Sequence, residues 1–124
     1  MALQESGEMY LETILILSQE KNVVRAIDIA DHMGFSKPSV SRALNKLREE
    51  KYIITDSNGY IAFTETGRKA AERVYRMHTV LTQVLLGIGV DEETASEDAC
   101  RMEHVISDET FEAILKHAKK YIKE

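Results

Sequence analysis

The feature that most constrains this fold is the run IADHMGFSKPSVSRALNKLREEKYI, residues 29–53. Its first part continues an apolar periodic segment, in which we expect Ala26, Ile27, Ile29 and Ala30 to face inward. That segment ends at Gly34, a residue typical of helix C-termini. Ser36 is then a candidate N-cap for a second helix, with Pro38 in the first turn, where its missing N–H costs no hydrogen bond. The run therefore predicts a helix, a tight turn and a second helix.

A β-hairpin is predicted directly after the second helix. The segments YIITD and GYIAFT are rich in strand-forming residues, and they flank the turn-forming stretch SNG at residues 57–59. Two helices followed by a hairpin is the order of a winged helix-turn-helix, in which the second helix enters the DNA major groove. The alternative is a small α/β core whose second helix has only a solvated polar face.

The polar face of the predicted second helix suits contact with DNA. Its apolar stripe comprises Val40, Ala43, Leu44 and Leu47, which leaves hydroxyl, amide and basic side chains outside. Hydroxyl groups can donate to phosphates, and arginine, lysine and asparagine can reach base edges or the backbone. The candidate DNA-binding residues are Arg25, Ser36, Lys37, Pro38, Ser39, Ser41, Arg42, Asn45 and Lys46, with Lys51 and Arg68 at the rim. The few basic residues per subunit favour a homodimer on an operator with two half-sites.

The remaining segments predict a mainly α protein. Helical patterns cover residues 7–21, 64–89, 91–106 and 107–124, with Thr64, Asp91 and Ser107 as candidate N-caps. We expect a winged helix-turn-helix DNA-binding domain at residues 1–70, followed by a helical domain at residues 71–124.

Composition and charge limit the function classes. A chain of 124 residues with one cysteine cannot form an internal disulfide, and it has neither a long apolar run nor a signal-peptide pattern at its start. We therefore expect a soluble cytoplasmic protein without a membrane partner. The net charge of −5 is uneven, because residues 20–76 carry +3 and residues 77–124 carry −5. The middle can face phosphates while the acidic remainder favours divalent cations.

The segment EDACRMEHVIS, residues 97–107, contains the single cysteine. Cys100, Glu103 and His104 have the spacing i, i+3, i+4, which puts them on one face of a helix. They form either part of a metal site or a chance grouping on an amphipathic helix. A nucleophile–base pair of Cys100 and His104 is a weaker alternative, since no oxyanion loop accompanies it. We therefore expect no enzyme and no organic substrate.

Almost the whole chain resembles the metal-dependent transcriptional repressors of the diphtheria-toxin-repressor and manganese-transport-regulator type. The resemblance is carried by EMYLETI, the 29–47 part of the helix-turn-helix run, FTETG, RMHTVLTQVLLGIGVDEE and EDACRMEHVISDE. It implies an N-terminal winged helix, a helical dimerisation and metal-binding domain, and control of metal-homeostasis genes. It ends near Glu124, so we expect the two-domain form without an SH3-like domain.

The resemblance also implies the metal ligands. The iron-responsive branch uses Met, Cys, Glu and His at the positions of Met9, Cys100, Glu103 and His104. The manganese branch has a Glu at the position of Glu12, which joins the equivalents of His78 and Glu103. A further iron-branch site is not intact, because its other two positions hold Thr82 and Ser96.

A thioether and a thiolate favour Fe²⁺ as the sensed ion, with Mn²⁺ second and Co²⁺, Ni²⁺ or Zn²⁺ as substitutes in vitro. A winged-helix regulator that senses an organic ligand independently of metal is the alternative.

Overall fold

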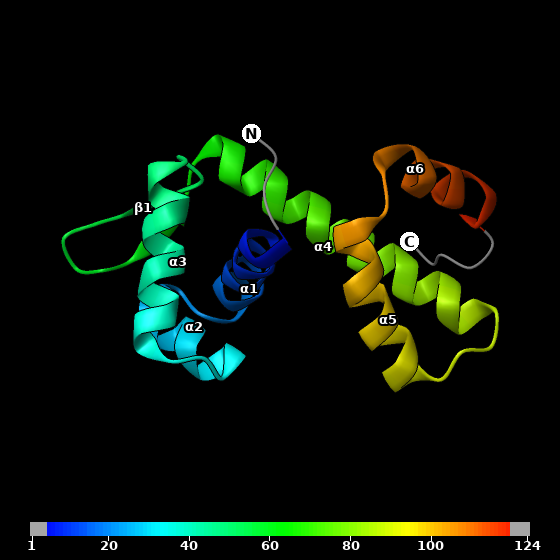
Figure 1. The fold of residues 1–124 in the computed structure, drawn as a ribbon, viewed down its shortest axis with the longest axis horizontal. Helices are drawn as coiled ribbons and strands as arrows, with labels where there is room; N and C mark the ends of the chain where they lie inside the picture. Colours follow the sequence, from blue (N-terminus) through cyan, green and yellow to red (C-terminus); the bar gives the residue numbers. More distant parts are fainter. Residues whose placement is uncertain (1–4, 120–124) are drawn as a thin grey trace. The chain divides into compact units, whose positions relative to one another are not determined.

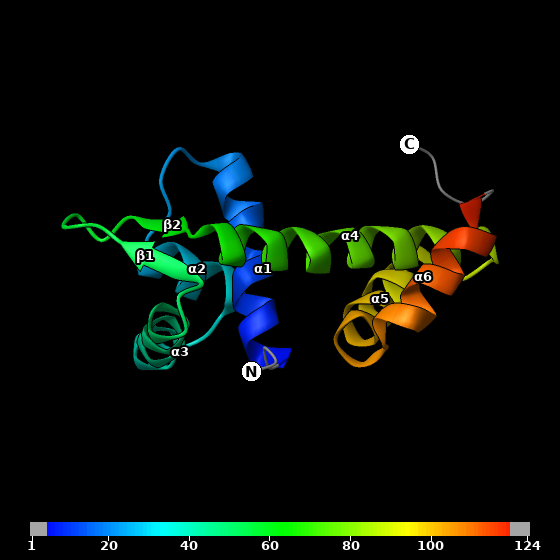
Figure 2. The same cartoon turned by 90° about the horizontal axis from the view of Figure 1, so that it is seen from above.

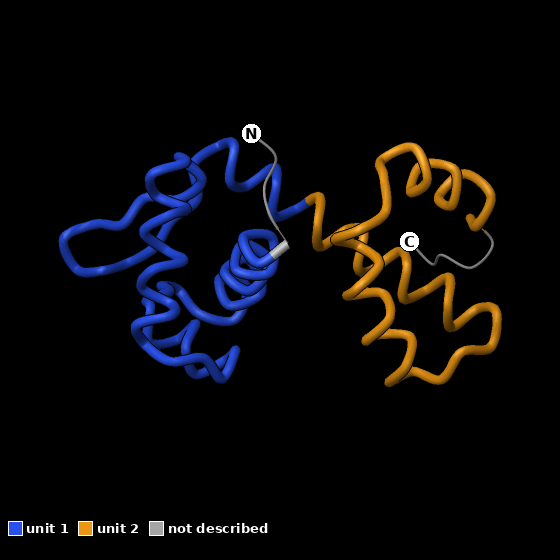
Figure 3. The backbone as a smooth tube through the Cα atoms, in the orientation of Figure 1, with its two compact units in different colours: residues 1–72 blue, residues 73–124 orange. Residues whose placement is uncertain are grey.

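The computed structural model describes residues 5–119, which fall into two compact units. The first comprises residues 1–72 and the second residues 73–124 (Figure 3). Their boundary lies within one long helix, α4 (Glu65–Gly87). Among the described residues, none of the helices is both long and apolar enough to cross a lipid bilayer.

The first unit contains a helix-turn-helix followed by a hairpin (Figures 1 and 2). Its elements are α1 (Glu5–Glu20), α2 (Ala26–Met33), α3 (Lys37–Glu49), β1 (Ile53–Thr55), β2 (Ile61–Phe63) and the start of α4. The helices α1, α2 and α3 pack against one another, and β1 packs on α3. Leu11, Ile29, Val40 and Leu44 are among the residues that form this core. The mainly α fold and the winged helix-turn-helix predicted from the sequence are confirmed.

The turn between α2 and α3 is built as its sequence predicts. Gly34 has a φ of 71°, in the left-handed region, and its N–H donates to the carbonyl of Ala30 at 2.9 Å. Ser36 caps α3, because its hydroxyl oxygen accepts a hydrogen bond from the N–H of Ser39 at 3.3 Å.

The inward orientation expected for Ala26 and Ile27 was wrong, since both are exposed. The helix α2 is only two turns long and buries one face, at Ile29 and Ala30. Position 27 is about 200° around the helix from Ile29, so Ile27 is directed away from the core.

The hairpin is antiparallel, with Ile53 opposite Phe63, Ile54 opposite Ala62 and Thr55 opposite Ile61. It is also tied to the segment before α2, because the N–H of Ile61 donates to the carbonyl of Val24 at 2.8 Å. At its end, the Thr64 hydroxyl accepts a hydrogen bond from the N–H of Gly67 at 3.0 Å and so caps α4, as predicted.

The second unit contains the remainder of α4, α5 (Glu92–Val105) and α6 (Asp108–His117). Its core consists of Met77, Val80, Leu81, Ala99 and Phe111. The Ser107 hydroxyl accepts a hydrogen bond from the N–H of Thr110 at 3.1 Å, so the predicted cap of α6 is confirmed. Asp91 occupies the N-cap position of α5 without a side-chain cap hydrogen bond. The part of the predicted last helix beyond residue 119 lies outside the described residues.

Candidate metal centre and nucleic-acid interface

The second unit buries a carboxylate between two histidines. Glu103, on α5, is only 2% exposed. Its Oε2 lies 3.0 Å from Nδ1 of His78, which comes from α4. Its Oε1 lies 3.3 Å from Nε2 of His104, on α5, but accepts no hydrogen bond from the described residues. Glu103 is therefore a buried anionic group that is only partly satisfied.

Cys100 adds a sulfur donor to this group. The helical spacing predicted that Cys100, Glu103 and His104 share a face of one helix, and α5 is that helix. A ligand atom from each of these side chains lies within 4.8 Å of the other two. The convergence expected from the spacing i, i+3, i+4 is thus present in the structure.

The donor set fits a divalent transition metal. Thiolate, imidazole and carboxylate are the ligands of Zn²⁺ and of the neighbouring first-row ions, whereas Ca²⁺ and Mg²⁺ prefer oxygen alone. An isolated buried carboxylate is costly, and a cation compensates that cost. The hydrogen bond between His78 and Glu103 also orients the imidazole ring. An ionised carboxylate can only accept hydrogen bonds, so Nδ1 of His78 carries the proton and directs it to Oε2 of Glu103.

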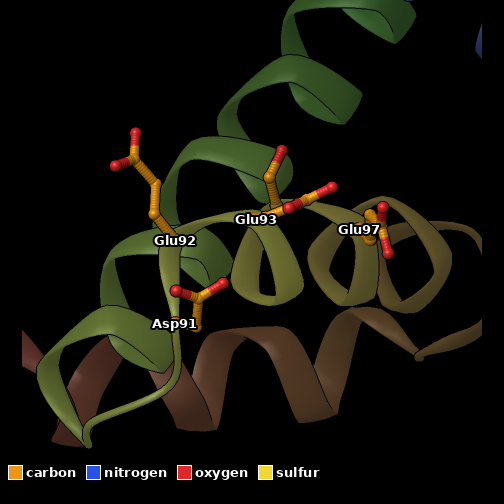
Figure 4. A pocket seen from close by; sticks show the side chains of 5 residues that line it. Asp91, Glu92, Glu93 and Glu97 are labelled. Carbon is orange, nitrogen blue, oxygen red and sulfur yellow. The ribbon is translucent and has the colours of Figure 1, made fainter.

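At the start of α5, a group of acidic residues lacks the convergence seen around Glu103. Asp91, Glu92, Glu93 and Glu97 line an open hollow at the start of α5. Their carboxylates fan out instead of converging on one point (Figure 4). Their position in the first turns of α5 is explained by the favourable interaction of acids with the N-terminus of a helix.

The two remaining ligand candidates, Met9 and Glu12, lie on α1 of the first unit. They are one turn apart, so they share a face of α1. The carbonyl of Met9 accepts a hydrogen bond from the Thr13 hydroxyl at 2.9 Å. Their part in the metal centre stays a prediction.

The candidate DNA-binding face lies on α3. Lys37, Pro38, Ser41, Arg42, Asn45 and Lys46 are all exposed there, beside the exposed N-cap Ser36. Val40, Leu44 and Leu47 are buried on the opposite side of the helix. The separation of α3 into an inner and an outer face therefore agrees with the sequence pattern.

Several of these polar groups already have intramolecular partners. The Ser36 hydroxyl donates to Oγ of Ser39 at 2.9 Å, and Arg42 donates from Nη2 to the same oxygen at 3.4 Å. Asn45 accepts from Arg48, which also donates from Nη1 to the Thr55 hydroxyl of β1 at 2.7 Å. These bonds orient the outer side chains of α3, and one of them connects α3 to the hairpin.

Tyr60, beside the predicted DNA-binding residue Arg25, escaped the sequence reasoning. Arg25, at the N-cap of α2, donates from Nη2 to the Tyr60 hydroxyl at 2.9 Å. Its guanidinium carbon also lies 4.7 Å from the centroid of the Tyr60 ring. Residues 25 and 60 are far apart in the sequence, so no local pattern links them. The only sequence signal is an aromatic residue next to the turn of the predicted hairpin.

A winged helix-turn-helix joined to a helical unit in which a thiol and imidazoles surround a buried carboxylate defines a class of metal-responsive DNA-binding proteins. Family comparison agrees over both units. Residues 2–60 match the family "Iron dependent repressor, N-terminal DNA binding domain". Residues 64–121 match "Iron dependent repressor, metal binding and dimerisation domain". The chain belongs to the diphtheria-toxin-repressor and manganese-transport-regulator family of metal-dependent transcriptional repressors.

Three individual relatives illustrate the similarity. The chain is 33% identical to the diphtheria toxin repressor of Corynebacterium diphtheriae over 118 residues, which are 94% of this chain and 52% of that protein. It is 35% identical to the HTH-type transcriptional regulator MntR of Geobacillus kaustophilus over 102 residues, 82% of this chain and 72% of that one. The structure of the manganese regulator SloR matches with a TM-score of 0.82 and 28% identity, covering 99% of this chain and 56% of that chain. The chain thus spans about half the length of two of these relatives.

Proposed function

We propose that this protein is a cytoplasmic repressor that binds operator DNA when a divalent transition metal occupies the Cys100–Glu103–His104 centre. The observation that carries the proposal is the enclosure of Glu103 between His78 and His104, with Cys100 on the same helix. A carboxylate buried in this way is stabilised by a positive charge beside it. Membership of a metal-dependent repressor family supports the same conclusion.

Cys100, Glu103 and His104 are proposed to hold the ion, with His78, Met9 and Glu12 as further ligands. A bound divalent ion would supply positive charge at Glu103 and a rigid cross-link between the helices that carry its ligands. Because Met9 and Glu12 belong to the first unit and the other residues to the second, their joint ligation would order the DNA-binding unit. The protein would then lose less conformational entropy when it binds DNA.

Iron is our first choice for the sensed ion and manganese the second. Cys100 and Met9 offer sulfur donors, which favour Fe²⁺, Co²⁺, Ni²⁺ and Zn²⁺ over Mn²⁺ at equal concentrations. The relatives do not decide the matter, because one of them is described as a manganese regulator while the matching family is described as iron dependent. The proposed targets are genes of metal homeostasis.

The proposed DNA-bound form is a homodimer, since residues 64–121 match a dimerisation domain. Each subunit would place the outer face of α3 in the major groove of one half-site. Metal and DNA would then bind cooperatively, and operator DNA would tighten metal binding by the same factor by which metal tightens DNA binding.

The deciding experiment is DNA binding under anaerobic, reducing conditions. The probe is a duplex selected from a random-sequence library by the wild-type protein, titrated with Mn²⁺, Fe²⁺, Co²⁺ or Zn²⁺ and with a chelator control. We expect binding that depends on metal and is tightest with Fe²⁺. Activation by Mn²⁺ but not Fe²⁺ would reject the choice of iron. Binding that persists in chelator would instead select a regulator of an organic ligand.

The role of the thiol is tested with Cys100→Ala, for which Ser96→Ala is the matched control because Ser96 is exposed on the same helix. We expect Cys100→Ala to weaken metal binding, followed directly by calorimetry, and Ser96→Ala to leave it unchanged. Equal metal affinity in the two variants would remove Cys100 from the ligand set.

A further inference from the structure

We infer that Arg25 and Tyr60 form a preassembled clamp for a DNA backbone phosphate, in which Arg25 makes the contact and Tyr60 holds it in position. This inference rests on the proposed DNA-binding function. It adds a residue of the hairpin, Tyr60, to the candidate DNA-binding residues on α3 and at the start of α2.

The geometry fixes the guanidinium in two ways at once. The Tyr60 hydroxyl accepts a hydrogen bond from Nη2 of Arg25 at 2.9 Å. The Tyr60 ring lies beneath the guanidinium, with 4.7 Å from the guanidinium carbon to the ring centroid. That distance is within the range of a cation–π interaction. The other N–H groups of the guanidinium take no part in the bond to Tyr60, and the side chain of Arg25 is exposed.

Both partners are attached to ordered backbone. The N–H of Arg25 donates to Oδ2 of Asp28 at 2.9 Å, at the first turn of α2. On the hairpin, Oδ1 of Asp56 accepts from the N–H of Asn58 at 2.8 Å and from the N–H of Tyr60 at 3.0 Å. Each end of the clamp is therefore held by an aspartate that accepts hydrogen bonds from the main chain.

The backbone also joins the two ends directly. Val24 precedes Arg25 and Ile61 follows Tyr60, and the N–H of Ile61 donates to the carbonyl of Val24 at 2.8 Å. If the hairpin moved away from the start of α2, this hydrogen bond would break together with the contacts between Arg25 and Tyr60.

The local charge points to an anionic partner. Lys21 pairs with Asp28 at 2.9 Å, so one of the two aspartates that hold the clamp is already matched by a cation other than Arg25. The Asp28 carboxylate accepts from Lys21 and from the N–H of Arg25, while the exposed guanidinium of Arg25 donates to Tyr60. A guanidinium whose rotamers are already restricted loses less conformational entropy when it binds a phosphate than a mobile one does.

The clamp is tested with full-length protein and the metal that gives the tightest binding. Two fluorescein-labelled duplexes are compared: the library-selected duplex and a duplex of about 30 base pairs of unrelated sequence. The variants are Arg25→Ala, Tyr60→Ala, Tyr60→Phe and the double variant, measured at several salt concentrations. Lys116→Ala is the charge-matched control, since it removes one exposed cation from α6.

We expect Arg25→Ala to weaken binding about tenfold on both duplexes and to lower the slope of log K against log[salt] by about one per subunit. Tyr60→Ala should weaken binding about threefold without changing that slope, because the charge of Arg25 remains. Tyr60→Phe keeps the ring and should fall between Tyr60→Ala and wild type. In the Arg25→Ala background, Tyr60→Ala should have no further effect, because Tyr60 acts only through Arg25.

Each of the following outcomes would overturn the clamp. Wild-type affinity and salt slope in Arg25→Ala would remove the phosphate contact. Additive effects of the two alanine substitutions would give Tyr60 a separate role, and a lowered melting temperature in Tyr60→Ala would make that role structural. A wild-type protein that binds neither duplex with any metal would remove the proposed function and the clamp together. Metal-dependent wild-type binding alongside a neutral Arg25→Ala would reject the clamp alone.

Discussion

The two candidate sites use polar residues in opposite ways. On α3 the candidate DNA-binding side chains are exposed, and the residues that hold the helix in place are buried on its other face. In the second unit the candidate ligand Glu103 is itself among the most deeply buried side chains, next to the apolar core residue Ala99 on the same helix. Stability and function should therefore be separable on α3 and coupled at Glu103.

The largest expected effect is on the buried face of α3. Leu44 is 2% exposed, so Leu44→Ala removes packed methyl groups and leaves a cavity. We expect a loss of about 2–5 kcal/mol in the free energy of unfolding, measured by urea denaturation. A loss below about 1 kcal/mol would show that α3 is not held by its apolar face.

The coupling at Glu103 is tested with Glu103→Gln, which keeps the shape of the side chain and removes its charge. In wild type, a metal at roughly a hundredfold excess over its Kd should stabilise the fold by about 2.7 kcal/mol. We expect this stabilisation to disappear in Glu103→Gln, followed as the metal-induced rise in melting temperature.

The metal-free variant should be no less stable than metal-free wild type, because Glu103 is then no longer a buried anion. A metal-induced rise that matches wild type would contradict the assignment of Glu103 as a ligand.

The exposed face of α3 should respond to substitution in the opposite way. Arg42→Ala should weaken binding to the selected duplex by about 1–3 kcal/mol and relax preference at one base position. The melting temperature should change little, because exposed substitutions typically shift stability by less than about 0.5 kcal/mol. Gel-shift titrations and thermal denaturation of the same sample measure both. If Arg42→Ala lowered both the melting temperature and the affinity for DNA, stability and function would not be separable on α3.

The smallest expected effect is a pH dependence confined to the first unit. The hydrogen bond from Lys21, helped by the N–H of Arg25, lowers the pKa of Asp28 below its usual range. Because the folded-state pKa is depressed, this stabilisation is complete above the unfolded pKa of about 3.9 and is lost as the pH falls through the folded-state pKa.

Asp28→Asn should therefore destabilise the protein slightly at about pH 6 and less at about pH 3, by urea denaturation. Asp31→Asn, an exposed substitution on the same helix, controls for the loss of one negative charge. An effect of Asp28→Asn that is independent of pH would assign the role of Asp28 to packing.

Local sequence patterns predicted most of the elements of this fold. Gly34 and Ser36 act through bonds to residues within four positions, so their roles in the turn could be inferred from neighbours alone. The same holds for Cys100, Glu103 and His104, because helical periodicity alone brings them to one face. Ile27 was misjudged because α2 is too short for an apolar residue to define which side is buried.

Gly67 has a structural role that local sequence patterns do not reveal. The motif FTETG indicated only a resemblance to the family and a helix start. In the structure, a Cβ on Gly67 would lie 1.8 Å from the carbonyl oxygen of Tyr52, so no larger residue fits where α4 passes the chain before β1. The reason for the glycine is a contact between segments that are separate in the sequence.

The sequence by itself determined the order of the elements, the outer face of α3 and the shared face of Cys100, Glu103 and His104, because each depends on periodicity and on neighbours within one helical turn. Only the tertiary structure decided that His78 donates to Glu103 across two helices and that Tyr60 holds Arg25. Those pairs lie 25 and 35 residues apart, and the positions of their partners depend on how the intervening elements pack. The enclosure of Glu103 between two histidines and the orientation of Arg25 are thus properties of the packed chain.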